Sequence, residues 1–172
     1  MIINHPEALQ SSFTVCLQPT STTVPDCGYP TVPFFRAWSE AMTDHFYTTN
    51  ITEMEAFFDN GYTDQGIAGY ILPSDTQAPT AVPLFRVYNA QIGNHAYTTN
   101  ASERDAFTAS GYVSEGIAGF VYPYQECGTV PFYRLSDGQS DTFYTTAQVE
   151  VDDFIEQLGY RFRNVAAYVN SQ

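Results

Sequence analysis

The sequence contains no lysine, and its six basic residues, all arginines, stand against 19 acidic ones, giving a formal net charge of −13. Nucleic-acid binding depends on neutralising phosphates with Lys and Arg, so this balance excludes a nucleic acid as the partner. It also disfavours an anionic membrane surface or an anionic wall polymer. No apolar stretch approaches the roughly 18 residues of a membrane helix, so we expect no membrane insertion.

The residues that are abundant are aromatic, because 13 Tyr and 13 Phe bring the aromatic content to 16%. A chain of 172 residues is long enough to bury a substantial core. Residues 1–30 form an N-terminal extension without the apolar segment of a secretory signal peptide. We therefore expect either a mature form with an added Met or export by another route.

From residue 31 onward the chain consists of three copies of one unit. Pro33, Pro83 and Pro131 occupy equivalent positions, and the first two copies resemble each other more than either resembles the third. We treat the copies as one domain of three repeats, because a unit of this size cannot bury its own strands and helix. The copies are residues 31–80, 81–128 and 129–172.

Each copy predicts the order strand, strand, helix, strand. A proline-led aromatic run (VPFFR, VPLFR or VPFYR) precedes a polar turn and a second strand (HFYTT, HAYTT or TFYTT). Asn50 and Asn100 then stand at N-cap positions, with a Glu three residues later as in a capping box. A glycine in each copy marks the end of the helix. These glycines are Gly61, Gly111 and Gly159.

Three copies predict an α+β fold of three lobes closed with pseudo-threefold symmetry, either β-trefoil-like or a small three-lobed barrel. An open solenoid is the alternative, but it would leave two unpaired ends exposed.

The succession of FR, DHFYTT, a Glu-containing helix, GY and GIAGY resembles a repeat family of unknown function, known from secreted fungal proteins and bacterial cell-surface proteins. In the bacterial members such repeats accompany peptidoglycan hydrolases, which implies a wall- or glycan-binding accessory role. The resemblance covers residues 31–170, implies a secreted protein, and supplies no catalytic residues. The third copy departs from the pattern, with Thr142 in place of His and Arg163-Asn164-Val165 in place of Glu-Gly-Ile.

Three cysteines leave one without a partner. Cys27 and Cys127 both precede a glycine shortly before a VP strand, so in a closed ring of lobes they would lie near each other. A disulfide there would close a loop of roughly 100 residues, which contributes about 4–5 kcal/mol in the chain-entropy model. Pairing of Cys16 with Cys27, or three reduced thiols, are the alternatives.

Two N-x-S/T sequons begin at Asn50 and Asn100, the predicted helix caps, and capping explains them without a glycan. The three arginines that end the first strands occupy one position in three copies. We predict a structural role for them, as ion pairs or carbonyl contacts inside each lobe. They are Arg36, Arg86 and Arg134.

The candidate ligand-binding residues are those that combine planar polar groups with aromatic rings, as a sugar site requires. We expect Asp44 and Asn94 to be exposed polar contacts. Trp38 and Tyr88 are stacking platforms if their strand lies at a rim, and core residues otherwise. The tyrosines of the second strands can equally be core residues whose hydroxyls bind a turn. The set is Trp38, Asp44, His45, Tyr47, Tyr88, Asn94, His95, Tyr97, Asp141 and Tyr144.

No catalytic residue, metal site or cofactor is predicted, because the histidines lie in separate copies and no His-x-x-x-His or Cys-x-x-Cys motif occurs. We therefore expect a secreted, non-catalytic, lectin-like protein whose partner is a glycan or a glycoprotein, with up to three equivalent shallow sites. The alternatives are a protein-interaction or inhibitor module and, less favoured, an enzyme with its site in one lobe.

Overall fold

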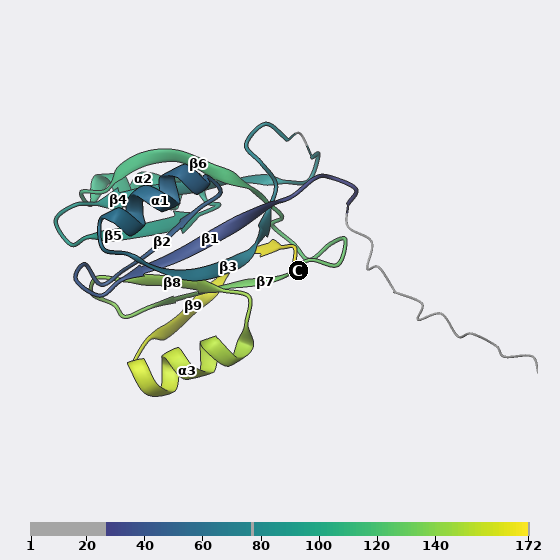
Figure 1. Ribbon diagram of the computed structural model, residues 1–172. Helices are drawn as coiled ribbons and strands as arrows, with labels where there is room; N and C mark the ends of the chain where they lie inside the picture. The colour runs from purple at the N-terminus through teal and green to yellow at the C-terminus, as the bar shows by residue number, and fades with distance from the viewer. Residues whose placement is uncertain (1–26, 77, 172) are drawn as a thin grey trace, which may run out of the picture.

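The computed structural model describes residues 27–76 and 78–171, which fold into three lobes of one strand–strand–helix–strand order (Figure 1). The first lobe contains β1 (Val32–Ser39), β2 (Asp44–Thr48), α1 (Ile51–Asp59) and β3 (Thr63–Ile71). The second contains β4 (Val82–Asn89), β5 (Asn94–Thr98), α2 (Ala101–Ala109) and β6 (Val113–Val121). The third contains β7 (Val130–Ser136), β8 (Thr142–Thr145), α3 (Gln148–Leu158) and β9 (Arg161–Val169).

In every lobe the first strand is the middle strand of an antiparallel sheet, with the orders β2-β1-β3, β5-β4-β6 and β8-β7-β9. The hairpin register places Trp38 opposite His45 and Tyr88 opposite His95. Because opposite residues of an antiparallel pair lie close together on one face, each histidine is paired with an aromatic side chain.

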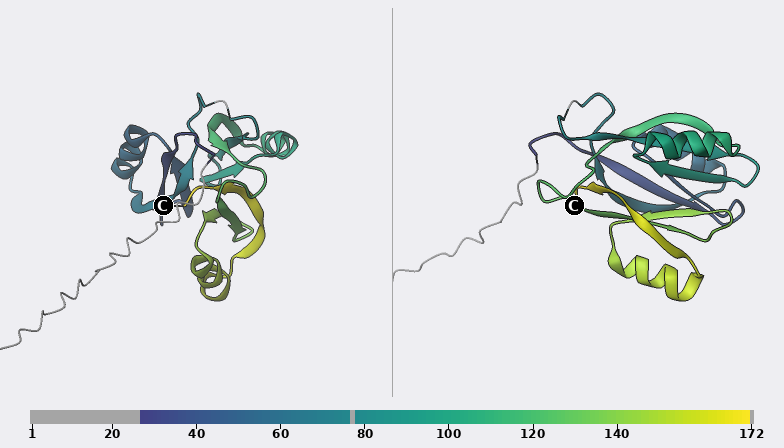
Figure 2. Two further views of the ribbon diagram at one scale, coloured as in Figure 1. Left: turned by 90° about the vertical axis from the view of Figure 1, so that its right-hand side faces the viewer. Right: turned by 180° about the vertical axis from the view of Figure 1, so that it is seen from behind.

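The three lobes surround a common axis, with their helices outermost (Figure 2, left). The ends of β3, β6 and β9 meet in isolated bridges of two backbone hydrogen bonds each, 2.8–3.0 Å long. Gly119 lies at one of these crossings, where a Cβ would come within 2.8 Å of the Leu72 carbonyl oxygen. The bridges, which also join the third lobe back to the first, are Leu72–Phe120, Tyr122–Tyr168 and Tyr70–Asn170.

An apolar core with matching contributions from each lobe fills the space around this axis. The middle strands contribute Phe34, Leu84 and Phe132, all at most 1% exposed. The second strands contribute one fully buried tyrosine each. Smaller clusters lie under α1, around Phe46, and under α3, around Phe143.

The expectation of an α+β fold closed into a trefoil-like or barrel structure is wrong. Strands make up 47% of the described residues and helices 20%, so the protein is mostly β, and its described strands form three separate sheets rather than a closed barrel. No continuous ladder of backbone hydrogen bonds joins the described sheets of neighbouring lobes. On the edge strand β2, for example, the backbone N–H of Tyr47 donates instead to a side chain of the second lobe, the hydroxyl of Tyr97, at 2.9 Å. The prediction of three similar units is confirmed.

The helix caps agree with the sequence except in one detail. The Asn50 side chain accepts hydrogen bonds from the backbone N–H groups of Thr52 and Glu53, and Asn100 caps α2 in the same way. Glu53, however, does not return to the cap as in a capping box. Thr48 Oγ1 accepts the Asn50 N–H at 3.0 Å and donates to the Glu53 carboxylate at 2.5 Å. The second carboxylate oxygen is thus free for a group outside the helix.

Cys27 and Cys127 form a disulfide, with Cα atoms 5.1 Å apart. It joins the segment that enters the first lobe to the one that enters the third, the pair of lobes that the chain does not link in sequence. Cys16, the alternative partner, lies outside the described residues. The described helices have 9–11 residues, and none of them has the length and apolarity needed to cross a membrane.

Candidate functional site

Three of the predicted ligand-binding residues form a hydrogen-bonded ring inside the core. Tyr47, Tyr97 and Tyr144 are fully buried. Each hydroxyl reaches the equivalent tyrosine of another lobe, where it accepts from the backbone N–H and donates to the carbonyl oxygen, at 2.7–2.9 Å. Burial raises the pKa of all three hydroxyls, that of Tyr144 to about 12, so they keep their protons. These buried hydrogen bonds hold the three lobes together.

The sequence suggested contacts of the repeated arginines inside each lobe, but all three join neighbouring lobes. Among the described residues, only Arg86 also makes an ion pair inside its own lobe, with Glu115. Arg86 binds Glu53 through two hydrogen bonds of 2.7 and 3.0 Å. Partial burial alone would raise the pKa of the three glutamates, but hydrogen bonds from the arginine and from the threonine that ends each second strand outweigh it and lower the pKa. The three pairs are Arg86–Glu53, Arg134–Glu103 and Arg36–Glu150.

Each histidine of the second strands is held by an aspartate of the preceding lobe in the ring. Asp44 accepts from the backbone N–H of His95 at 2.7 Å and lies 2.6 Å from His95 Nδ1. Asp141 binds His45 in the same way, at 2.9 and 2.6 Å. A carboxylate can only accept, so Nδ1 donates to the aspartate, and the neutral tautomer that fits this contact has its acceptor at Nε2.

The expectation that Asp44 and Asn94 are exposed is wrong. Asp44 is 0% exposed and Asn94 5%, and Asp44 is in contact with His95 of the neighbouring lobe. At the boundary of the second and third lobes Asn94 and Thr142 stand where the other boundaries have Asp and His. Asn94 Nδ2 donates to the Tyr112 hydroxyl at 2.9 Å, whereas Asp44 accepts from the equivalent Tyr62. This boundary therefore lacks the His–Asp pair.

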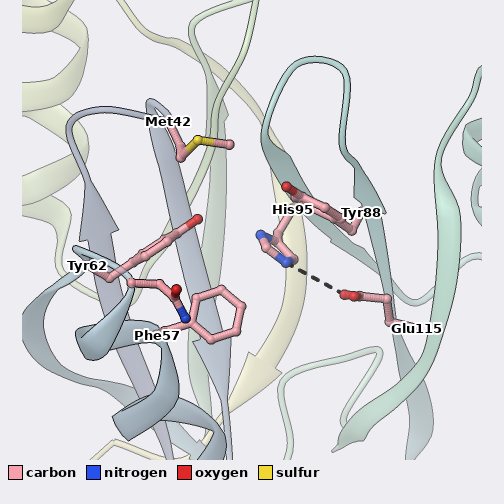
Figure 3. A pocket seen from close by; sticks show the side chains of 7 residues that line it. Met42, Phe57, Tyr62, Tyr88, His95 and Glu115 are labelled. Carbon is pink, nitrogen blue, oxygen red and sulfur yellow. Dashed lines mark ion pairs between the residues drawn. The ribbon is translucent and has the colours of Figure 1, made fainter.

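The boundary of the first and second lobes opens into a pocket of about 310 Å³, which we call the His95 pocket (Figure 3). Tyr88 stacks on the His95 ring with the ring centroids 4.3 Å apart, and Phe57 of the first lobe lies 5.7 Å away. Glu115 Oε2 lies 3.7 Å from His95 Nε2 and 2.9 Å from Arg86 Nε, as an ion pair not aligned for a hydrogen bond.

A homologous pocket of about 720 Å³ lies between the third and first lobes, and we call it the His45 pocket. Trp38 takes the place of Tyr88, with its ring centroid 4.4 Å from that of His45, and Phe154 takes the place of Phe57, at 5.8 Å. The His45 side chain is 3% exposed, and its Nε2 has no hydrogen-bond partner among the described residues. Both pockets have volumes typical of small-molecule sites.

The hairpins beside the two pockets differ at the position where the backbone takes a positive φ. Gly93, at φ 70°, lets Met42 pack closely, since a Cβ there would lie 2.7 Å from Met42 Cε. Thr43, which lines the His45 pocket, holds the equivalent position with φ 52°. A β-branched residue in the left-handed region is strained, and such strain concentrates at functional sites.

The structure thus divides the predicted residues into two groups. Trp38, His45, Tyr88 and His95 line the pockets. The aspartates lie buried behind the histidines, and the tyrosine ring is in the core. Sequence reasoning missed the opposite wall, which the neighbouring lobe supplies. The only features of the sequence that indicate this wall are a phenylalanine in the helix and a Gly-Tyr pair after the helix, both repeated in the copies. These wall residues are Phe57, Tyr62, Phe154 and Tyr160.

One group of possible metal ligands occurs among the described residues, formed by Cys27, Glu126 and Cys127. Both sulfur atoms belong to the disulfide, so neither is available as a thiolate ligand.

Comparison with protein-family models places residues 33–170 in a domain of unknown function, DUF5648. The chain belongs to the DUF5648 family. The matched residues span all three lobes, so both pockets lie within the DUF5648 domain. Comparison of the DUF5648 chain with curated proteins and with solved structures yielded no match.

Proposed function

We propose that this DUF5648 protein is a non-catalytic carbohydrate-binding protein with two sites, the His95 pocket and the His45 pocket. The observation that carries the proposal is the buried Nε2 of His45, an acceptor without a partner beside the Trp38 ring. A buried polar atom without a hydrogen bond costs free energy, which a ligand hydroxyl would recover.

The chemistry of both pockets suits a pyranose ring. The C–H face of a sugar packs on an aromatic ring such as Trp38 or Tyr88, while its hydroxyls donate to histidine and bridge to planar carboxylates or amides. Glu115 in one pocket and Gln65 in the other supply such groups. Two sites flanking the first lobe also make avidity available toward a repetitive glycan.

Binding of the full chain to an array of glycans at neutral pH, followed by calorimetric titration, tests the proposal. Trp38→Ala and Tyr88→Ala each remove one platform, and each should weaken binding about two- to tenfold, as expected for a loss of about 0.5–1.5 kcal/mol. Tyr124→Ala is the matched control, because Tyr124 is 78% exposed and lines neither pocket. Absence of binding to every glycan would contradict the proposal.

A second candidate, a protein-interaction or inhibitor module, is favoured by the exposed first half of β6, which carries two exposed apolar side chains. Val113 is 67% exposed and Ile117 44%, on a strand at the edge of its sheet. Exposed edge strands are templates for pairing with another chain. A protein complex lost in Val113→Lys but kept in Trp38→Ala would support this candidate over the first.

We also propose that the protein is secreted, since disulfides such as Cys27–Cys127 persist in oxidising compartments. Immunodetection should find the oxidised protein in the culture medium of the producing cells. Confinement of the whole population to the cell interior would contradict this.

A further inference from the structure

The two pockets have equivalent histidines, His95 and His45, among their lining residues, but they differ in charge. In the His95 pocket the lining carboxylate, Glu115, is paired with Arg86. Gln65 replaces that carboxylate in the His45 pocket, where Glu40 and Asp137 line the rim instead. Neither of these acids forms an ion pair with another described residue, and no arginine lines the His45 pocket.

Asp137 is held as a carboxylate at the rim. Partial burial by itself would raise its pKa, but hydrogen bonds from the backbone N–H groups of Asp141, Gln139 and Ser140 outweigh this and lower the pKa. Glu40 is exposed and makes no hydrogen bond within the part of the chain that the structure describes. The rim of the His45 pocket is therefore negatively charged, on a protein whose formal net charge is −13.

The aromatic walls of the His45 pocket also favour a positively charged ligand. The Trp38 and Phe154 rings both lie next to the His45 ring, with centroids 4.4 and 5.8 Å from it. Aromatic faces attract cations, and Trp does so most strongly. Below them, His45 Nε2 is a buried acceptor without a partner, so a ligand must bring a hydrogen-bond donor.

We propose that the His45 pocket binds a hexosamine through its protonated amino group, whereas the His95 pocket binds neutral sugars. The ammonium group lies near the Glu40 and Asp137 carboxylates, the sugar ring packs on Trp38, and a hydroxyl donates to His45 Nε2. This inference rests on the proposed function and assigns its ligand class at one of the two sites.

Two matched probes test the assignment: a fully deacetylated glucosamine tetrasaccharide and its N-acetylated counterpart. At about pH 7 and low salt, where histidine at its ordinary pKa is neutral and a part of the amines is protonated, the deacetylated tetrasaccharide should bind the full chain more tightly. Glu40→Gln combined with Asp137→Asn should weaken its binding about three- to tenfold and reduce the salt dependence. The amide that Asp137→Asn introduces retains an oxygen for the backbone N–H groups, and unchanged thermal unfolding verifies that the variant is folded.

Glu55→Gln combined with Asp59→Asn is the control, since it removes two exposed carboxylates that line neither pocket and should leave binding of the deacetylated probe unchanged. Equal affinity of the two tetrasaccharides, or no effect of the rim variant, would overturn the assignment to a hexosamine. The proposed function would still stand if neutral glycans bind and Tyr88→Ala weakens them. Failure of every glycan at both pockets would remove the proposed function and this inference together.

Discussion

Asp44 of the first lobe binds both the backbone N–H and Nδ1 of His95 in the second lobe, at 2.7 and 2.6 Å. Asp141 and His45 repeat this arrangement at the boundary of the third and first lobes. At the remaining boundary both positions differ, with Asn94 and Thr142 in place of the pair. A buried Asp without the His would lack a partner for its charge, so a change at one position favours a change at the other.

Restoring the pair at the third boundary should show this coupling. Asn94→Asp alone should lower the free energy of unfolding, because it places an unpaired carboxylate at a site that is 5% exposed. Combined with Thr142→His, the loss should be partly recovered, with a coupling energy of about 1–3 kcal/mol. Urea denaturation of the wild type, both single variants and the double variant measures it.

The matching cycle at the first boundary, Asp44→Asn with His95→Thr, serves as the reference and should give coupling of similar size. Additive effects at the third boundary, within about 0.5 kcal/mol, would contradict the view that Asn94 and Thr142 are a paired replacement.

The ring of hydrogen bonds among Tyr47, Tyr97 and Tyr144 predicts that loss of a single hydroxyl lowers stability. Tyr97→Phe removes the partner of both the N–H and the carbonyl oxygen of Tyr47, in a core that is closed to water. The free energy of unfolding should fall by about 2–4 kcal/mol, because two buried backbone groups lose their hydrogen bonds. Chemical denaturation measures the change, and Tyr124→Phe, at a residue 78% exposed, should leave stability within about 0.5 kcal/mol of the wild type.

Features set by local sequence could be predicted here. Asn50 caps α1 through N–H groups two and three residues ahead, so the pattern of neighbouring residues is sufficient to identify it. The triplicate spacing likewise indicated that the lobes must pack on one another. A closed arrangement of the lobes favoured a disulfide between Cys27 and Cys127. The sequence alone could not decide between this pairing and one of Cys16 with Cys27.

Features that arise between lobes could not be read in the same way. Arg36 pairs with Glu150, 114 residues away, and nothing in the local sequence distinguishes this from a contact within a lobe. Asp44 was expected to be an exposed polar contact, but its exposure depends on the surface of the second lobe. Each pocket is also composite: His45 comes from one lobe and Phe154 from another. A repeat pattern identifies the equivalent positions of the copies. It does not show which residues of a neighbouring lobe each position contacts.

The glutamates that bind the repeated arginines predict how stability depends on pH. Their pKa values are lowered in the folded protein, so their contribution is present above the unfolded value of about 4.3 and is lost as the pH falls through the folded values. The urea midpoint should therefore decline between about pH 5 and pH 3. The triple variant Glu53→Gln, Glu103→Gln, Glu150→Gln should decline less steeply, and an identical slope would exclude these pairs as a source of the effect.

The disulfide is expected to stabilise the one lobe boundary that has no connecting chain. Cys27 and Cys127 are 100 residues apart, and the cross-link spans the entrances to the first and third lobes, whose shared boundary contains the His45 pocket. Cys127→Ser should lower the free energy of unfolding by about 2–5 kcal/mol, since the unfolded chain gains the entropy of an open loop. Denaturant titration measures the loss, and the wild type under reducing conditions should reproduce it.

Cys16→Ser is the matched control for this cross-link, because it removes a thiol and leaves the Cys27–Cys127 bond in place. It should unfold like the wild type and retain the same sensitivity to reductant. Weakened glycan binding in Cys127→Ser should be confined to ligands that Trp38→Ala also affects, because the His95 pocket lies between lobes that the chain itself connects. Equal weakening at both pockets would show that the disulfide supports the whole ring of lobes rather than the boundary it spans.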